Sequence, residues 1–203
     1  MRALLIVDLQ NDFCAGGALA VPGADAIVPV VNRLVPAFSP IIQSQDWHPR
    51  GHVSFASSHP GKAPGETVLA SYGVQELWPD HCVPGTRGAD FHPHLDTTRT
   101  HLVLRTGWRV DMDAYSAFRE NDRRTPTGLH GFLQELGVTT LVTCGLATDY
   151  CVKWSVLDAR RLGYEVVVVR DAVHGLDIEG SLARAWTEME EAGARVASAT
   201  ELI

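Results

Sequence analysis

The sequence predicts an α/β fold, a three-layer α/β/α arrangement in which helices cover both faces of a mostly parallel central sheet. Two observations support this prediction. Short apolar, β-branched runs alternate with segments of helical periodicity in the first and last thirds of the chain, which is the pattern of repeated βαβ units. Residues 166–169 are four consecutive valines, as expected for a parallel strand that is buried on both faces.

The same patterns place each element along the chain. Strands are expected at residues 3–7, 40–44, 101–104, 139–143, 165–169 and 195–197. Helices are expected at residues 24–38, 129–136, 148–162 and 180–191. Proline and glycine set the helix ends: Pro29 interrupts the first helix, which ends by Pro36, and Gly137, Gly163 and Gly193 stop the other three.

The chain of 203 residues suits one domain, residues 1–203, and is long enough to bury a full core. Residues 47–100 are different, because they are rich in Gly, Pro and His and show little periodicity. A long irregular stretch in a compact domain commonly builds a site, and sites of open α/β sheets lie beyond the carboxyl ends of the strands. We therefore expect a metal- and substrate-binding region where the end of the first strand, the loop after the second and the turn before Thr148 meet.

Composition and charge exclude several classes of partner. The formal net charge is −7, the pI is near 5.7, and no block of Lys and Arg offsets this acidity, so we expect no nucleic-acid partner. There is no signal-peptide pattern and no apolar run of the roughly 20 residues that cross a bilayer, so we expect no membrane partner. The four cysteines lack CxxC spacing and are expected to be thiols in a cytoplasmic protein. The sequence leaves oligomeric state open, a homo-oligomer included.

Cys151 lies near the start of a predicted helix. A strand ends at Gly145, Thr148 is placed to cap the helix, and Cys151 then falls in the first turn. The partial positive charge of a helix N-terminus lowers the pKa of a thiol, and the free amides of residues 147–151 could form an oxyanion hole. A nucleophilic role competes with that of a small buried apolar side chain, which is the interpretation we favour for Cys144.

Asp8 directly follows the buried run ALLIV. A carboxylate at the carboxyl end of a strand points into the expected site, where it could take the proton of the Cys151 thiol and pass it to a leaving ammonia. The alternative is an aspartate that caps a turn, and this suits Asp12, which lies further into the loop.

Several metal-type ligands follow the second strand. The segment SQDWHPRGH places Asp46, His48 and His52 within seven residues, and WPDHC adds His81. One carboxylate and several imidazoles suit Zn²⁺, Fe²⁺ or Mn²⁺, so the sequence predicts one divalent metal ion without deciding which. The alternative is a scatter of surface histidines, and we assign to it His59, His92, His94, His101, His130 and His174.

The segments MRALLIVDLQNDFCAGGALAVPGA, SQDWHPRGHVSFAS, WPDHCVPGTRGADFHP, DAYSAF and GLATDYCV run nearly from end to end of the chain. Taken together, they resemble the nicotinamidase (pyrazinamidase) family within the isochorismatase-like hydrolases. The resemblance implies the isochorismatase-like fold and hydrolysis of nicotinamide to nicotinate and ammonia, in the salvage of pyridine nucleotides such as NAD. It implies a thioester on Cys151, with Asp8 as the proton shuttle.

The resemblance also implies a metal held by Asp46, His48 and His81, with His52 as a possible fourth ligand. A metal that binds the pyridine nitrogen would orient the substrate.

The resemblance implies the remaining pocket residues as well. The family has a cis peptide bond in its GxA turn, here between Leu146 and Ala147, which exposes amides for the oxyanion. Phe13 and Trp78 match the aromatic residues that sandwich the pyridine ring, and Tyr115 matches a residue lining the same pocket. Plain core packing is the alternative for Phe13 and Trp78.

One feature of the family is missing from this sequence. Its third catalytic residue is a lysine, followed by glycine, a short way before the YS of the DAYSAF-like segment, where this chain reads VLRTGWRVDMDAYSAF. An ungapped match puts Thr106 at the lysine position, and a shift of one residue puts Arg105 there. Arg105 could replace the lysine by charge but cannot readily exchange protons. The only lysines of the chain, Lys62 and Lys153, lie elsewhere.

The sequence leaves three functions open. The first is a nicotinamidase, and the second is a sibling cysteine hydrolase that acts on another small amide, such as a carbamoyl compound, a maleamate or a cyclic amide. The third is a catalytically impaired relative that binds a pyridine or a metal, as the absent lysine suggests. The metal-type loop argues against many siblings, and isochorismatase itself does not need Cys151 or this loop.

Overall fold

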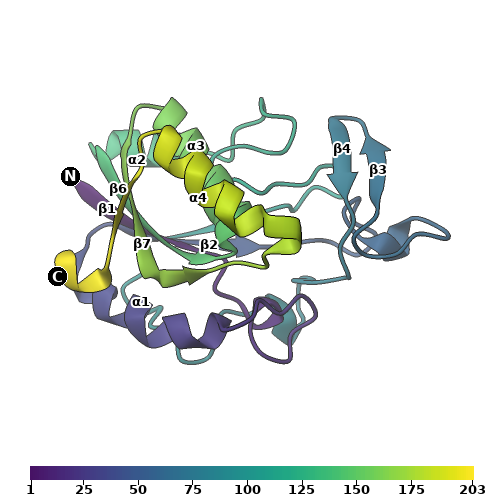
Figure 1. Ribbon diagram of the computed structural model, residues 1–203, viewed down its shortest axis with the longest axis horizontal. Coiled ribbons are helices and arrows are strands. Elements are labelled where there is room, and N and C mark those ends of the chain that lie inside the picture. The colour runs from purple at the N-terminus through teal and green to yellow at the C-terminus, as the bar shows by residue number, and fades with distance from the viewer.

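A computed structural model describes all residues, 1–203, and shows a six-stranded sheet at the centre of the chain (Figure 1). The strand order is β5-β2-β1-β6-β7-β8, and every neighbouring pair is parallel. The strands are β1 (Arg2–Val7), β2 (Ile41–Asp46), β5 (Leu102–Thr106), β6 (Thr140–Leu146), β7 (Glu165–His174) and β8 (Arg195–Ala197).

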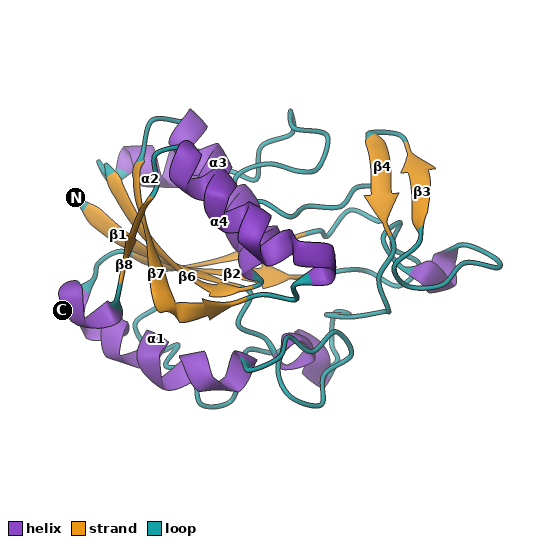
Figure 2. Cartoon of the chain, viewed as in Figure 1, coloured by secondary structure: helices purple, strands orange, loops and turns teal.

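Helices cover both faces of this sheet, which confirms the three-layer α/β/α prediction. They are α1 (Val28–Leu34), α2 (Leu129–Glu135), α3 (Lys153–Arg161) and α4 (Ser181–Glu191). Figure 2 shows α1 on one side of the sheet and α3 and α4 on the other. None of these helices is both long and apolar enough to span a bilayer.

Strand β1 divides the core because successive side chains point to opposite faces of a sheet. Leu4 and Ile6 pack in the apolar cluster that includes α1. Ala3, Leu5 and Val7 pack in a second cluster, with residues of α2, α3 and α4. The two buried clusters explain why the strands read as unbroken apolar runs in the sequence.

The carboxyl ends of the strands differ from the prediction. Strands β2, β5, β6 and β7 extend by two to five residues beyond their expected ends, to Asp46, Thr106, Leu146 and His174. In β2 and β5 the added residues are mostly polar, and polar residues do not continue the apolar pattern from which the strands were predicted. The same ends border the candidate site described below.

The helix expected at residues 24–38 is divided. Helix α1 is flanked by 3₁₀ turns at Ala24–Ile27 and Val35–Ala37. Pro29 lies in the first turn of α1 and does not interrupt it, because a backbone N–H at that position has no partner within the helix.

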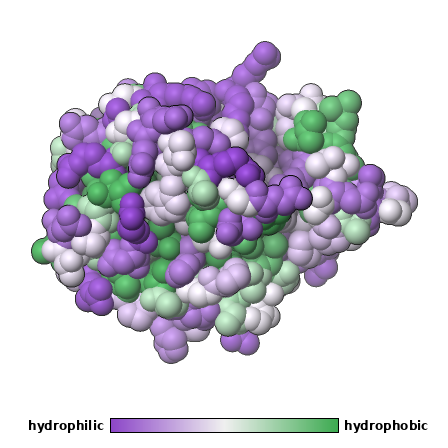
Figure 3. Space-filling view, viewed as in Figure 1, coloured by the Kyte–Doolittle hydropathy of each residue, from purple (hydrophilic) through white to green (hydrophobic).

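The region 47–100, expected to be irregular, contains a hairpin of β3 (Thr67–Ala70) and β4 (Gly73–Glu76). Leu69 and Val74 are paired across the hairpin, and they are 84% and 74% exposed. Because neither side chain packs into the core, the sequence shows no alternation that would predict these strands. Figure 3 shows the corresponding apolar patch over the hairpin, which Figure 1 places away from the main sheet.

Gly145 allows β6 to approach β1 closely, just before Asp8. It pairs with Val7 and has a φ of 111°, a conformation that side chains rarely adopt. A Cβ atom at this position would lie 2.0 Å from the carbonyl oxygen of Val7. Glycine is therefore required where β1 leads into the candidate site.

We expect Gly145→Ala to destabilise the protein by about 3 kcal/mol, because the new methyl group would collide with the backbone of Val7, which can move only by disrupting β1. Gly131→Ala in exposed α2 is the matched control, since its Cβ would meet nothing within 4 Å. That substitution should stabilise the protein by about 0.5 to 1 kcal/mol. Urea unfolding measures both changes, and equal stability of the two variants would contradict the requirement for glycine at 145.

Candidate active site

A cavity lies beyond the carboxyl ends of the central strands, where three segments were expected to meet. Its lining includes most of the predicted site residues: Phe13, Asp46, His48, Trp78, His81, Tyr115, Ala147 and Cys151. The sequence analysis did not single out the rest of the lining, which is Leu19, Val21, Asp113, Tyr150 and Leu176. Asp8, His52, Arg105 and Leu146 do not line the cavity.

Cys151 lines this cavity and Asp8 lies beside it behind the lining, although Asp8 follows β1 and Cys151 belongs to the turn before α3. The Asp8 carboxyl group lies close enough to the Cys151 thiol for each group to shift the pKa of the other. Ser44 of β2 donates its hydroxyl to Oδ1 of Asp8 at 2.7 Å, and the Asp8 amide donates to Ser44 Oγ at 3.2 Å. Both side chains of the pair are buried, so the neighbouring strands β1 and β2 hold the carboxyl group facing the thiol.

Burial determines where protons reside in this pair. Burial, helped by the negative charge of Asp46, raises the pKa of Asp8 to about 7. Burial and the charges of Asp8 and Asp46 also raise the pKa of the Cys151 thiol well above its usual value. The expectation that the helix N-terminus would lower this pKa is therefore wrong, because burial and the nearby carboxylates raise it. The thiol keeps its proton until a base removes it.

The turn that carries Cys151 differs from the predicted start of a helix. Residues Thr148–Val152 form a π-helical turn, and α3 begins only at Lys153. Ala147 occupies the N-cap position, and the hydroxyl of Thr148 has no hydrogen-bond partner, so Thr148 does not cap the helix. The Leu146–Ala147 peptide bond is cis, as the resemblance implies.

Asp46, His48 and His81 form a compact group of metal-type donors. Oδ2 of Asp46 lies 3.2 Å from Nε2 of His48 and 3.6 Å from Nε2 of His81. Donors that share a tetrahedral zinc ion with bonds of about 2.0–2.1 Å lie about 3.3 Å apart. The group therefore has the spacing and the donor types of a zinc site.

Backbone carbonyl groups orient the two imidazoles. Nδ1 of His48 lies 3.0 Å from the Gly107 carbonyl oxygen, and Nδ1 of His81 lies 2.8 Å from that of Pro79. Nδ1–H donation to a carbonyl leaves Nε2 free to face a metal, which is the usual arrangement of metal-binding histidines. The residues present thus fit a divalent ion.

Asp46 and His48 form an ion pair when no metal ion lies between them. Burial opposes ionisation, but the charge of Asp46 raises the pKa of His48 to about 9. Against the effect of burial, His48 and His81 lower the pKa of Asp46. A bound cation would replace the proton that His48 holds.

His52, the possible fourth ligand, lies outside the Asp46–His48–His81 group, and its ligand atom is instead grouped with those of His48 and Asp113. Its ring stacks near that of His48, with centroids 4.2 Å apart. Its Nδ1 lies 2.7 Å from Ser54 Oγ and its Nε2 3.2 Å from the Met112 carbonyl oxygen. Burial lowers the pKa of His52 to about 3, so the ring is neutral. Both nitrogens are occupied, and His52 supports His48 from behind.

Arg105 also differs from its prediction, because its side chain lies outside the cavity. The guanidinium carbon lies 3.8 Å from the centre of the Trp47 ring, and Nε donates to Gln45 Oε1 at 3.4 Å. Successive residues of a strand point to opposite faces, and it is the next residue, Thr106, that is buried. Its hydroxyl donates to Asp46 Oδ1 at 3.3 Å.

No lysine or arginine lines the cavity. Lys62 pairs with Glu66, and Lys153 pairs with Glu188. The family lysine is therefore not replaced by another cationic side chain from elsewhere in the chain.

Aromatic side chains form one wall of the cavity. The hydroxyl of Tyr115 accepts a hydrogen bond from Trp78 Nε1 at 3.1 Å. The Tyr150 ring contacts Trp78 edge-on at 5.0 Å between centroids, and Phe13 contacts His81 in the same way at 5.5 Å. Tyr150 was missed in the sequence analysis, although its position directly before Cys151 was a usable signal.

Asp113 was also missed, and it is a buried carboxyl group near His48. Its Oδ1 lies 3.9 Å from His48 Nε2, and its Oδ2 accepts a hydrogen bond from Gln75 Nε2 at 2.9 Å. Burial raises the pKa of Asp113. The usable signal was its place at the start of the DAYSAF segment.

The fold and the cavity together define the class of protein, an α/β/α hydrolase whose cavity places a thiol and a carboxyl group beside a metal-type donor set. Comparison with protein families matches residues 2–201 to the isochorismatase domain. The chain is 47% identical to the nicotinamidase of Acinetobacter baylyi, over 99% of this chain and 94% of that protein. It is 48% identical to the nicotinamidase of Escherichia coli, over 95% and 92%.

Solved structures show the same relationship. A nicotinamidase–pyrazinamidase of Acinetobacter baumanii superposes with a TM-score of 0.98 at 46% identity, covering 100% of this chain and 98% of that one. A nicotinate complex from L. infantum gives 0.88 at 34% identity, covering 100% and 95%. The pyrazinamidase of Pyrococcus horikoshii, in complex with zinc, gives 0.78 at 35% identity, covering 97% and 98%. The chain belongs to the isochorismatase family, in the group that contains the nicotinamidases.

We expect His48→Ala to lower the bound metal content of this site to near zero, because it removes one of the three donors of the Asp46–His48–His81 group. Elemental analysis after loading with zinc and gel filtration measures the loss. His94→Ala is the control, since His94 is exposed and belongs to none of the groups of possible metal ligands. Equal metal content in the two variants would refute the ligand assignment.

Proposed function

We propose that this protein hydrolyses nicotinamide to nicotinate and ammonia through a thioester on Cys151, in the salvage of pyridine nucleotides. The observation that carries the proposal is the buried pair of the Asp8 carboxyl group and the Cys151 thiol, next to the Asp46–His48–His81 group. The nicotinamidases of about half-identical sequence support the choice of substrate. The nicotinate complex of the L. infantum relative supports a pyridine ring in the cavity.

The first half of the reaction uses the proton of the Cys151 thiol. Asp8, ionised at neutral pH in part of the molecules, takes this proton, and the thiolate attacks the carboxamide carbon of nicotinamide. Backbone amides of residues 147–151 hold the oxyanion, except that of Tyr150, which donates to the Ala147 carbonyl oxygen. Asp8 then gives the proton to the departing amine, so that ammonia leaves and a nicotinoyl thioester remains on Cys151.

The second half regenerates the thiol. A water molecule gives a proton to Asp8 as its oxygen attacks the thioester carbonyl carbon. The sulfur leaves, takes the proton back from Asp8, and nicotinate is released. One carboxyl group thus serves as base and acid in each half, for which a pKa near neutrality is suited.

Phe13 and Trp78 hold the pyridine ring between them by apolar and stacking contacts. Asp46, His48 and His81 hold a divalent ion, which we propose to be Zn²⁺, Fe²⁺ or Mn²⁺. When bound, the ion supplies a Lewis-acidic position for the ring nitrogen and so orients the carboxamide toward Cys151. The zinc in the related pyrazinamidase supports this assignment.

We also propose that the protein is located in the cytoplasm. The four cysteines are all free, and thiols persist in reducing compartments.

A second candidate is a catalytically impaired relative that binds a pyridine without efficient turnover. The observation that favours it is the absence of any lysine or arginine from a cavity with several buried carboxyl groups. Thr106 occupies the position that the ungapped match assigns to the lysine, and its hydroxyl contacts Asp46. The two candidates differ in whether ammonia is released from nicotinamide.

We expect Cys151→Ala to lower ammonia release from nicotinamide at least about a thousandfold, because no other thiol reaches the cavity. Metal content and nicotinate binding by calorimetry should be unchanged. Cys144→Ala is the control, since that buried thiol lies within β6 and does not line the cavity; it should keep turnover. Full activity of Cys151→Ala would exclude the thioester, and an inactive but nicotinate-binding natural protein would favour the second candidate.

We expect Thr106→Lys to raise the rate of nicotinamide hydrolysis about tenfold, because an ammonium group beside Asp46 would favour the ionised form of Asp8 and the thiolate. Thr106→Met is the matched control, with similar length and no charge, and should not raise the rate.

Arg105→Ala should stay within about twofold of the natural protein, because the guanidinium lies outside the cavity. A large loss with Arg105→Ala would contradict this placement.

A further inference from the structure

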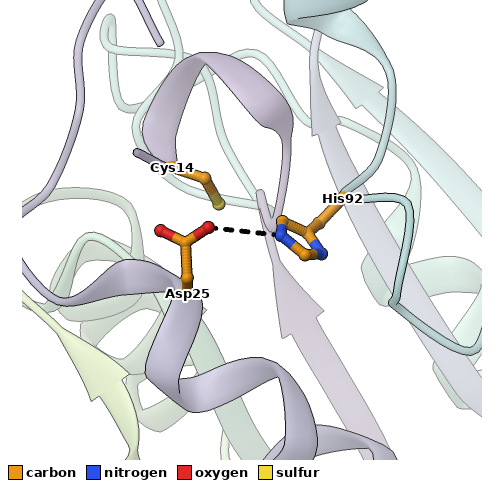
Figure 4. Close-up of side chains that lie close together, drawn as sticks. All are labelled: Cys14, Asp25 and His92. Atoms are coloured by element: carbon orange, nitrogen blue, oxygen red, sulfur yellow. Dashed lines mark hydrogen bonds and ion pairs between the residues drawn. The ribbon is translucent and has the colours of Figure 1, made fainter. Parts of the chain in front are cut away.

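A second group of metal-type donors lies outside the proposed active site. The side chains of Cys14, Asp25 and His92 point toward one another (Figure 4), and their ligand atoms all lie within 4.8 Å of each other. Oδ1 of Asp25 is 3.3 Å from Nε2 of His92. The three residues line an open cavity of about 460 Å³ that shares no residue with the lining of the active-site cavity.

Backbone contacts hold these donors in place. Oδ2 of Asp25 accepts a hydrogen bond from the Ala15 amide at 2.9 Å, which leaves Oδ1 directed at His92. The His92 amide donates to the Leu9 carbonyl oxygen at 2.9 Å. Cys14 follows directly on the turn Asn11–Phe13 and is buried, with its thiol facing the other two side chains. The backbone contacts alone therefore bring these three side chains together, and no metal ion is needed to position them.

We propose that Cys14, Asp25 and His92 form a second zinc site, with water from the adjoining cavity as the fourth ligand. A sulfur, an imidazole nitrogen and a carboxylate oxygen form a donor set that suits Zn²⁺ and disfavours Mg²⁺, Ca²⁺ and Mn²⁺. The carboxylates of Asp12 and Asp25 line the cavity against the single guanidinium of Arg87, so the local charge does not oppose a cation.

Binding changes the protonation of two ligands. The Cys14 thiol loses its proton to solvent and becomes the thiolate that coordinates zinc. In the metal-free chain, the amide of His94 donates to Nδ1 of His92 at 3.2 Å, so Nε2 of His92 carries the hydrogen that faces Asp25. On binding, this hydrogen moves to Nδ1, Nε2 coordinates zinc, and the amide of the exposed His94 turns to water.

The site would fix one wall of the active-site cavity. The chain between Cys14 and Asp25 carries Leu19 and Val21, and both line that cavity. A zinc ion that joins the two ends of this segment to His92 closes it into a tethered loop. Zinc at this position would therefore be structural, and it would order the apolar wall next to Phe13.

Metal stoichiometry tests the proposal without using activity. The chain is stripped with a chelator, loaded with Zn²⁺, filtered and analysed for zinc. We expect two equivalents in the natural protein and one in His48→Ala, Cys14→Ser and Asp25→Asn. The new side chain in Asp25→Asn can still accept the hydrogen bond from the Ala15 amide, so a loss of zinc in this variant would not be due to the loss of this contact. Circular dichroism checks that each variant is folded. His94→Ala, the matched control, should keep two equivalents.

Cobalt distinguishes the two sites directly, since only a thiolate ligand gives a sulfur-to-cobalt charge-transfer band in the near ultraviolet. We expect this band in Co²⁺-loaded natural protein, in His48→Ala and in Cys151→Ser, and its loss in Cys14→Ser. One zinc equivalent in the natural protein that is unchanged in Cys14→Ser would overturn the proposal. So would two equivalents in both Cys14→Ser and Asp25→Asn, or a cobalt band that depends on Cys151 instead of Cys14.

Discussion

The burial of several carboxyl groups in one small site is the constraint on which the rest of this structure depends. Asp8, Asp46 and Asp113 are all nearly inaccessible, and an ionised carboxylate is costly to bury unless it is paired and hydrogen-bonded. Each carboxyl group has one polar neighbour: Ser44 donates a hydrogen bond to Asp8, His48 pairs with Asp46, and Gln75 donates a hydrogen bond to Asp113. No fixed cation of the chain compensates them, so protons and a bound divalent ion must do so.

This constraint explains why the thiol and its base are useful together. Because burial raises the pKa of the Cys151 thiol well above its usual value and that of Asp8 only to about 7, the proton stays on the sulfur, and the Asp8 carboxylate is the neighbouring group that can accept it. The strand arrangement maintains this contact: β1 lies between β2, which carries Ser44, and β6, which leads to Cys151. Gly145 keeps β1 and β6 close at the point where Asp8 follows.

Sequence reasoning predicted the layers and the order of the elements because buried parallel strands leave long apolar runs. It predicted the meeting of Asp8, Cys151, Asp46 and His48 because the carboxyl ends of parallel strands share one edge, and the family resemblance added His81. It failed where the outcome depends on orientation. Neighbouring residues of a strand face opposite ways, so Arg105 points outward while Thr106 is buried. His52 lies beside His48, but both of its nitrogens have other partners. The hairpin β3–β4 was missed because its apolar side chains are exposed.

The proton exchange between Asp8 and Cys151 is the central claim, and Asp8→Asn tests it most directly. Asparagine keeps the shape of the side chain and can still accept a hydrogen bond from Ser44, but it cannot take a proton. We predict that ammonia release from nicotinamide falls at least about a thousandfold, while metal content and nicotinate affinity stay unchanged. Turnover within about tenfold of the natural protein would contradict the account, because another group would then have to remove the thiol proton.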